Sequence, residues 1–150
     1  MAVLRDQPYC AFNFLVTCDR FDGGDAAKAG FQEVSGIGME VDALDYRNGN
    51  DKSNAVRKVP GLTRVTNVTL KRGVTGNPDF YNWIAAVRDG QNARSDVVIE
   101  LLDEAHQPVM RWKLHNAWPV KYAAPTLNAP GGQEIAIEEL VLTGERLEAE

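Results

Sequence analysis

LTRVTNVTLKRGVTGNPDFYNWIAAVRDG, residues 62–90, is the stretch that decides the expected fold. Its first part mixes β-branched and other apolar residues with threonines, a pattern that suits a pleated surface better than a helix. Glycines then allow a tight turn. Asn77 can cap a helix whose first position is Pro78, and Gly90 can end that helix. The stretch therefore predicts a strand, a turn and a helix, in that order.

The predicted helix carries one apolar stripe. Its members, spaced at i, i+3, i+4 and i+7, are Phe80, Trp83, Ile84 and Val87. Burial of four such side chains contributes about 6–12 kcal/mol before conformational entropy is counted, as an upper bound. Because no other segment has convincing helical periodicity, we expect this stripe to lie against a sheet or barrel.

The other apolar segments alternate as strands do. We expect strands in residues 11–18, 31–46, 96–102, 109–118, 120–122 and 134–147. A bulge or bend is expected at Gly36–Gly38, and a hairpin turn at Asp22–Asp25. In the last strand the apolar phase slips at Glu138–Glu139, which predicts either a bulge or burial of both faces. The fold class expected is mainly β: one domain, residues 1–150, an antiparallel β-barrel or sandwich of about seven or eight strands with one flanking α-helix.

Residues 47–60, RNGNDKSNAVRKVP, show no periodicity and carry a local excess of positive charge. The charged residues are Arg47, Lys52, Arg57 and Lys58 against a single acid, Asp51, so the segment has a charge of +3. Since the whole chain has a formal charge of −5, the remainder carries −5 − 3 = −8. Long loops in compact domains are usually functional or disordered, and both interpretations stay open here.

A second charge cluster lies near the end of the sequence. Its acids are Glu138, Glu139, Glu145, Glu148 and Glu150. Arg146 is the one basic residue among them, so the cluster has a charge of −4. We expect a solvated acidic face, with Glu145, Glu148 and Glu150 as candidates for contact with a basic surface.

Composition and motifs argue against several functional classes. A net charge of −5 does not suit specific nucleic-acid binding. No apolar segment approaches the length of a membrane span. Nothing resembles a signal peptide, so synthesis in the cytoplasm is expected. His106 and His115 lack further ligands at metal spacing, and no serine has a nucleophile elbow around it. We therefore expect no enzyme activity, no metal and no cofactor.

The order of features along almost the whole chain resembles the tail tube proteins of contractile-tailed phages and of phage-tail-like contractile injection systems, which are distant relatives of the type VI secretion tube protein. The segments that carry the resemblance are FNFLV (12–16), GFQEVSGI (30–37), DYRNG (45–49), NVTLKRG (67–73), FYNW (80–83), LDE (102–104), PV (108–109), WKLHNAWPVK (112–121), IEEL (137–140) and ERL (145–147).

This resemblance implies a β-barrel with a flanking helix, six copies to a ring, and rings stacked into a hollow tube for a toxin or DNA. The implied partners are further copies of the chain, a contractile sheath protein, and baseplate and cap proteins, in an assembled tail or a particle released outside the cell. The family's extended loop, which reaches a neighbouring ring, corresponds to Tyr46, Arg47, Asn48, Gly49, Asn50, Asp51, Lys52, Arg57 and Lys58. The alternatives are a single-ring baseplate or adaptor component and, third, a small β-barrel enzyme.

Overall fold

The computed structural model describes residues 4–21, 30–132 and 134–150. The elements in chain order are β1 (Phe14–Thr17), β2 (Glu33–Ser35), β3 (Met39–Tyr46), β4 (Arg57–Val65), β5 (Val68–Gly73), α1 (Asp79–Arg88), β6 (Ser95–Leu102), β7 (Pro108–Ala123), β8 (Ile137–Thr143) and β9 (Arg146–Ala149). This composition confirms the mainly β fold with one helix. The turn expected at Asp22–Asp25 lies outside the described residues.

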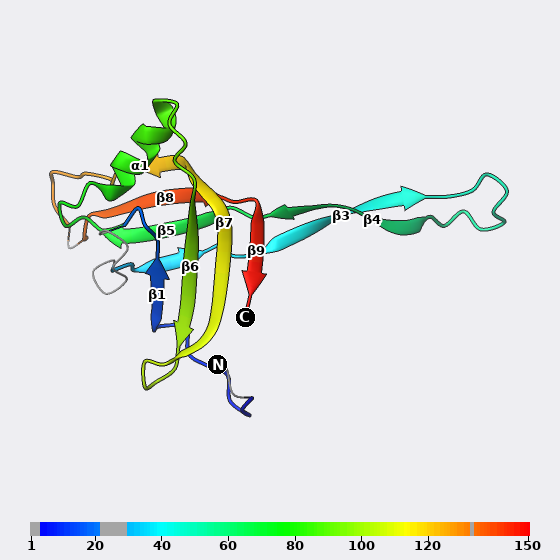
Figure 1. Cartoon of the computed structure of the whole chain (residues 1–150), viewed down its shortest axis with the longest axis horizontal. Coiled ribbons are helices and arrows are strands. Elements are labelled where there is room, and N and C mark those ends of the chain that lie inside the picture. The colour runs from blue at the N-terminus through cyan, green and yellow to red at the C-terminus, as the bar shows by residue number, and fades with distance from the viewer. Residues whose placement is uncertain (1–3, 22–29, 133) are drawn as a thin grey trace.

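The body of the molecule is one strongly bent antiparallel sheet of seven strands in the order β1-β6-β7-β8-β5-β2, with β9 paired to β7 (Figure 1). The long strand β7 bends the sheet because its first half pairs with β6 and β9 and its second half with β8. The sheet does not close into a barrel. Among the described residues, β1 pairs only with β6 and β2 only with β5, so these two short strands remain as edges.

The helix α1 covers one end of this sheet and supplies the largest core side chains. Phe80 and Trp83 are buried, and the Trp83 indole N–H donates to the Ala93 carbonyl. Val87 is partly buried against the same core, whereas Ile84 is partly exposed and does not belong to that cluster. The stripe is therefore deepest at the N-terminal half of the helix.

The start of the helix uses the predicted residues with a shift of one position. The helix begins at Asp79, one residue after Pro78, and the Asn77 Oδ1 atom accepts the Asp79 N–H at 3.1 Å. The expected interruption at Gly36–Gly38 separates β2 from β3. Gly36 has φ +84°, and a Cβ there would lie 2.2 Å from the Asn67 carbonyl oxygen, so this position needs glycine.

The expected phase slip in the last strand is wrong. Glu138, Leu140 and Leu142 alternate regularly as the buried positions of β8, so Glu138 belongs to the inner face. The chain then turns at Gly144 before β9. A Cβ at Gly144 would lie 2.3 Å from a methyl carbon of Leu114, so glycine permits the close approach of this turn to β7.

The solvated position expected for Glu138 is wrong as well, because this carboxylate pairs with Arg72 inside the protein at 2.7 Å. The Arg72 guanidinium also donates to the Asn77 carbonyl at 3.1 Å and lies over the Phe80 ring, 4.0 Å from its centroid. Tyr122 donates its hydroxyl to Glu138 at 3.3 Å, and burial together with the Glu138 charge raises the pKa of Tyr122. This cluster ties β5, β7 and β8 to the helix.

Candidate assembly surface

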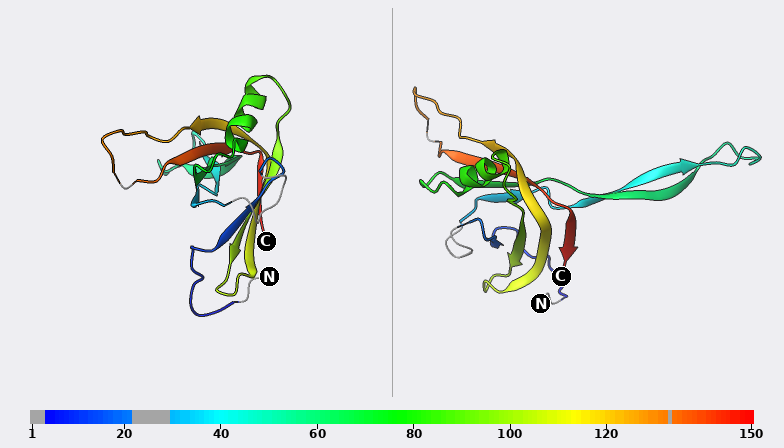
Figure 2. Two further views of the ribbon diagram at one scale, coloured as in Figure 1. Left: turned by 90° about the vertical axis from the view of Figure 1, so that its left-hand side faces the viewer. Right: turned by 45° about the horizontal axis from the view of Figure 1, so that its top comes forward.

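Strands β3 and β4 form a two-stranded antiparallel ribbon that projects far from the body (Figures 1 and 2). Within the segment expected to be aperiodic, residues 57–60 belong to β4 and pair with residues 43–46, so only residues 47–56 form the loop at the tip. The start of this strand was not predicted, because Pro60 and a pair of neighbouring basic residues interrupt its apolar pattern.

The root of the ribbon is closed by hydrogen bonds. The Thr66 backbone N–H donates to the Gly38 carbonyl at 3.0 Å, and the Thr66 hydroxyl donates to the Gly36 carbonyl. These bonds join the segment that enters β3 to the segment that leaves β4. The two strands of the ribbon are therefore held together where they leave the body.

The tip loop is organised by its own polar groups. Arg47 donates through Nε to the Ser53 carbonyl at 3.0 Å and through a terminal nitrogen to the Asp51 carbonyl at 2.9 Å. The Asp51 carboxylate accepts the Asn48 N–H at 3.1 Å, and the Tyr46 hydroxyl donates to the Asn48 side chain. Arg47 thus shapes the loop instead of presenting a free charge.

The other predicted contact residues of the loop are more open. Gly49, Asn50, Lys52 and Arg57 are exposed. Lys58 forms an ion pair with the Asp45 carboxylate across the two strands. Within the described part of the chain no ion pair involves Lys52 or Arg57, so these two cations carry the free positive charge of the tip.

Large apolar side chains are exposed all along the ribbon. They are Met39, Val41, Leu44, Tyr46, Val56, Val59 and Leu62. Their exposed fractions lie between 44% and 76%. A two-stranded hairpin has no core of its own and is marginal in water, and extended apolar surface on a soluble chain marks an interaction site. The ribbon therefore has the character of one half of an interface.

The predicted C-terminal acids lie on the body, away from the ribbon tip, and the structure does not bring them to the basic loop. Glu145 pairs with Arg94 and accepts a hydrogen bond from the Asn116 amide at 3.0 Å. The Glu150 carboxylate lies 3.7 Å from the Arg111 guanidinium. These acids already have partners within the chain.

Glu148 also has basic side chains as neighbours. Its carboxylate lies 3.2 Å from His115 Nε2 and 2.7 Å from an Arg146 nitrogen. Contact with the imidazole, followed by the positive charge of Arg146, lowers the pKa of Glu148. A surface that includes these acids is consequently closer to neutral than the sequence count of −4 indicates.

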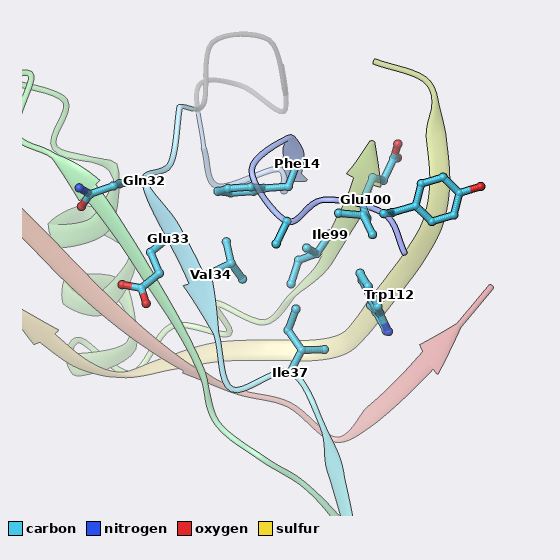
Figure 3. A pocket seen from close by; sticks show the side chains of 11 residues that line it. Phe14, Gln32, Glu33, Val34, Ile37, Ile99, Glu100 and Trp112 are labelled. Carbon is cyan, nitrogen blue, oxygen red and sulfur yellow. The ribbon is translucent and has the colours of Figure 1, made fainter. Parts of the chain in front are cut away.

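The sequence did not predict a cleft between the two free edges of the sheet. It has a volume of about 430 Å³ and lies between β1 and β2 (Figure 3). Apolar side chains predominate in its lining, among them Phe14, Val34, Ile37, Ile99 and Trp112. Alternation in the sequence indicates an inward face for Phe14 and Trp112, but only the pairing of strands shows that the lining residues meet around one opening.

Neither a metal site nor a membrane-spanning helix is found in the described residues. No group of three or more His, Cys, Asp or Glu side chains is placed there to hold a metal ion. In the same part of the chain, α1 is the one helix, and it is too short to cross a bilayer.

Comparisons with known proteins agree with this architecture. The model of the T4-like virus tail tube protein gp19 family matches residues 10–148. The chain is 29% identical to a protein in the sheath–tube complex of an extracellular contractile injection system, PVC, in the extended state. The alignment covers 97% of this chain and 93% of that one, with a TM-score of 0.81. A protein in the anti-feeding prophage cap, which terminates the AFP tube, is 28% identical over 100% of this chain and 95% of that one, with a TM-score of 0.82.

More distant structures share the fold alone. Hcp1 from Flavobacterium johnsoniae is 14% identical, with 91% of this chain and 93% of that one covered and a TM-score of 0.55. No curated protein sequence matches the chain. The family match spans nearly every strand of the body, the helix and the projecting ribbon. The chain belongs to the T4-like virus tail tube protein gp19 family.

Proposed function

We propose that this tail tube protein forms hexameric rings that stack into the inner tube of a contractile injection system or phage tail. A contractile sheath surrounds the tube, baseplate and cap proteins close its ends, and a toxin or DNA passes through its lumen. Similarity to proteins of a sheath–tube complex and of a tube-terminating cap supports the sheath and cap partners. The subunit acts in the assembled particle and has a structural role without catalysis.

The observation that carries this proposal is the exposed apolar ribbon. Strand β3 has eight residues, which at about 3.3 Å per residue extend roughly 26 Å from its root. The body of the same chain does not cover that length (Figure 1). A neighbouring copy in the next ring supplies the missing cover, and Tyr46–Arg57 at the far end provide the inter-ring contact.

Charge supports the same contact. The segment 47–60 carries +3 and the remainder of the chain −8, so the tip of one copy is attracted to the body of another. Exposed ion pairs contribute only about 0–1 kcal/mol each. Burial of apolar side chains therefore holds the tube together, and charge sets the register of the contact and the rate of association. Interfaces of this head-to-tail kind propagate because each copy presents both complementary surfaces.

The test is assembly of the purified chain, followed by negative-stain electron microscopy and sedimentation. Deletion of Asp51–Arg57 shortens the ribbon, and we expect a folded subunit by circular dichroism that forms no tubes. Replacement of residues 49–55 by a Gly/Ser segment of equal length is the matched control, since it keeps the strands and removes only tip side chains. Tubes of normal length from the deletion would contradict an inter-ring role for the ribbon.

A single-ring baseplate, adaptor or cap component is the second candidate, favoured by the 28% identity to a protein of a tube-terminating cap. The same micrographs separate the two functions. Long stacked tubes indicate the tube subunit, whereas isolated rings that do not grow as the protein concentration rises indicate the terminal component.

A further inference from the structure

The two faces of the ribbon follow from the strand register. Residues alternate along β3, so Met39, Val41, Ala43 and Asp45 share one face, and Glu40, Asp42, Leu44 and Tyr46 share the other. The pairs Leu44↔Val59 and Asp45↔Lys58 assign the facing residues of β4 to the same two faces. Each face can therefore be followed from the body to the tip.

Polarity changes along each face, in opposite directions. The first face is apolar near the body, at Met39 and Val41, and ends in the exposed Asp45–Lys58 ion pair. The second face begins with an ion pair and becomes apolar towards the tip. Its ion pair joins Asp42 to Arg64 at 2.8 Å next to the exposed Leu62, and its apolar residues nearer the tip are Leu44, Val59 and Tyr46. On a flat ribbon, neither face would be apolar throughout.

The ribbon is strongly twisted between the body and the tip (Figure 1). In Figure 1, β4 lies above β3 near the body, and β3 lies above β4 near the tip, so the viewer sees one face in the inner half and the opposite face in the outer half. The register shifts between Val41 and Ala43, where β4 contains one extra residue. Such a β-bulge increases local twist. Gly61 permits it, because a Cβ there would lie 3.1 Å from the Asp42 carbonyl oxygen and 3.2 Å from Leu44 Cγ.

We infer that the twist brings the apolar part of the first face and the apolar part of the second face to the same side of the ribbon. This continuous apolar side docks on a single second copy, while the opposite side remains in water. The apolar side consists of Met39, Val41 and Ala43 in the inner half and Leu44, Tyr46 and Val59 in the outer half. The opposite side, called the charged side, consists of Glu40, Asp42 and Arg64 with the exposed Leu62 in the inner half, and of Asp45 and Lys58 in the outer half.

A second copy is the occupant for two reasons. The body of the same chain does not reach the outer half of the apolar side, which lies beyond the crossing of the strands in Figure 1. Lys52 and Arg57 at the tip need an acidic partner surface, and the chain outside residues 47–60 carries −8. The inference rests on the proposed self-assembly and adds which side of the ribbon is buried in it.

The experiment measures the reaction of single cysteines with a charged maleimide, in the free subunit and in tubes. A Cys10→Ser background removes the exposed native thiol, and buried Cys18 remains as an internal reference. Val41→Cys and Val59→Cys report on the apolar side; Glu40→Cys and Lys58→Cys are matched controls on the charged side, each adjacent in sequence to its probe. Each variant is assembled as a minor fraction with parent subunits, so that tubes form even where a substitution weakens contact.

We expect assembly to slow the reaction at Val41→Cys and Val59→Cys by about tenfold or more, and at the charged-side positions by less than about twofold, because the centre of an interface excludes water and its rim does not. Protection of the 41 and 58 positions alone would show that one face of a flat ribbon is buried. Protection of all four would place the ribbon between two copies, and protection of none would leave it outside the interface. Any of these three patterns overturns the inference.

Failure of the proposed function gives a different result. If sedimentation shows that the parent chain does not assemble, the self-assembly proposal falls and the inference falls with it. If tubes form and the protection pattern differs from the expected one, only the assignment of the buried side is wrong.

Discussion

The core of the body and the ribbon differ in how far their apolar side chains are exposed. In the body, Phe80, Trp83 and Leu140 are at most 1% exposed, and they are covered entirely by the chain itself. In the ribbon, Val41 and Leu44 are 55% and 54% exposed. The body thus has a buried core of its own, whereas the ribbon has none and presents the same residue types at its surface. Substitutions in the body should change stability, and substitutions in the ribbon should change assembly.

Loss of an apolar side chain is the strongest test of this comparison. We expect Trp83→Ala to lower the free energy of unfolding by about 3–5 kcal/mol, because it removes the ring that joins helix to sheet and leaves a cavity. Leu44→Ala on the ribbon is the counterpart. It should change the unfolding free energy of the free subunit by less than about 0.5 kcal/mol and reduce tube formation.

Chemical denaturation of the free subunit and sedimentation of assembled material provide the two measurements. An unchanged denaturation midpoint for Trp83→Ala would show that the helix is not part of the core. A Leu44→Ala subunit that is clearly destabilised when free would show that the ribbon is already covered by its own chain.

The two regions also differ in their ion pairs, which gives the second prediction. Glu138→Ala leaves the Arg72 charge buried without its carboxylate, and we expect a loss of about 3–5 kcal/mol. Lys58→Ala removes the exposed pair with Asp45 and should cost about 0–1 kcal/mol. The double variant Arg72→Met/Glu138→Leu removes both buried charges and should recover most of the stability lost in Glu138→Ala. If the double variant is as unstable as the single one, the cost comes from the hydrogen bonds around the pair.

The contrast between the regions explains how much the sequence could reveal. The helix was predictable because its signals are local: Asn77, Pro78 and Gly90 lie within a few residues of the stripe. The buried pair was not, since Arg72 and Glu138 are 66 positions apart and an acid in a strand is normally solvent-facing. Alternation at Val68, Leu70 and Arg72 was the available signal, but only the register between β5 and β8 places the two charges opposite each other.

The candidate surface was predictable in location and not in form. Charge and lack of periodicity marked residues 47–60 as an insertion, and the family resemblance indicated its reach. The first strand of the ribbon lies within the strand expected at residues 31–46, but the second was only partly predicted, because its start falls in this segment, where Pro60, Arg57 and Lys58 interrupt the apolar pattern. The cleft lies between β1 and β2 because these strands are the two edges of the sheet. A local sequence pattern does not show which strands will be edges.

Charge at the ribbon tip gives the third prediction. Reversal of Lys52, Arg57 and Lys58 to Glu changes the charge of segment 47–60 from +3 to 3 − 6 = −3 while the subunit stays folded. Because the remainder of the chain is acidic, we expect the initial rate of assembly to fall by roughly 10–100-fold at low salt. The difference from the parent should shrink as salt is raised, since interactions between exposed charges more than about 10 Å apart are largely screened at 0.1 M ionic strength. Light scattering at several salt concentrations measures both effects, and an unchanged rate would remove tip charge from the assembly step.

The last and smallest effect tests whether the C-terminal acids meet the tip. In the background of the triple reversal, substitution of Glu145, Glu148 and Glu150 by Lys should restore part of the assembly rate, because the acidic loop then faces added positive charge. Restoration should be incomplete, since Glu145 and Glu150 already pair with Arg94 and Arg111 and their loss disturbs the body.

The matched control reverses the same number of exposed acids elsewhere on the body, at Asp19, Asp89 and Glu104. Total charge is then identical in the two compensated proteins, so light-scattering rates compare position alone. Faster assembly with the C-terminal set places these acids opposite the tip of the next copy. Equal rates would show that attraction arises from the charge of the whole body, as expected for long-range steering, and that the C-terminal acids serve only their own pairs with Arg94, His115, Arg146 and Arg111.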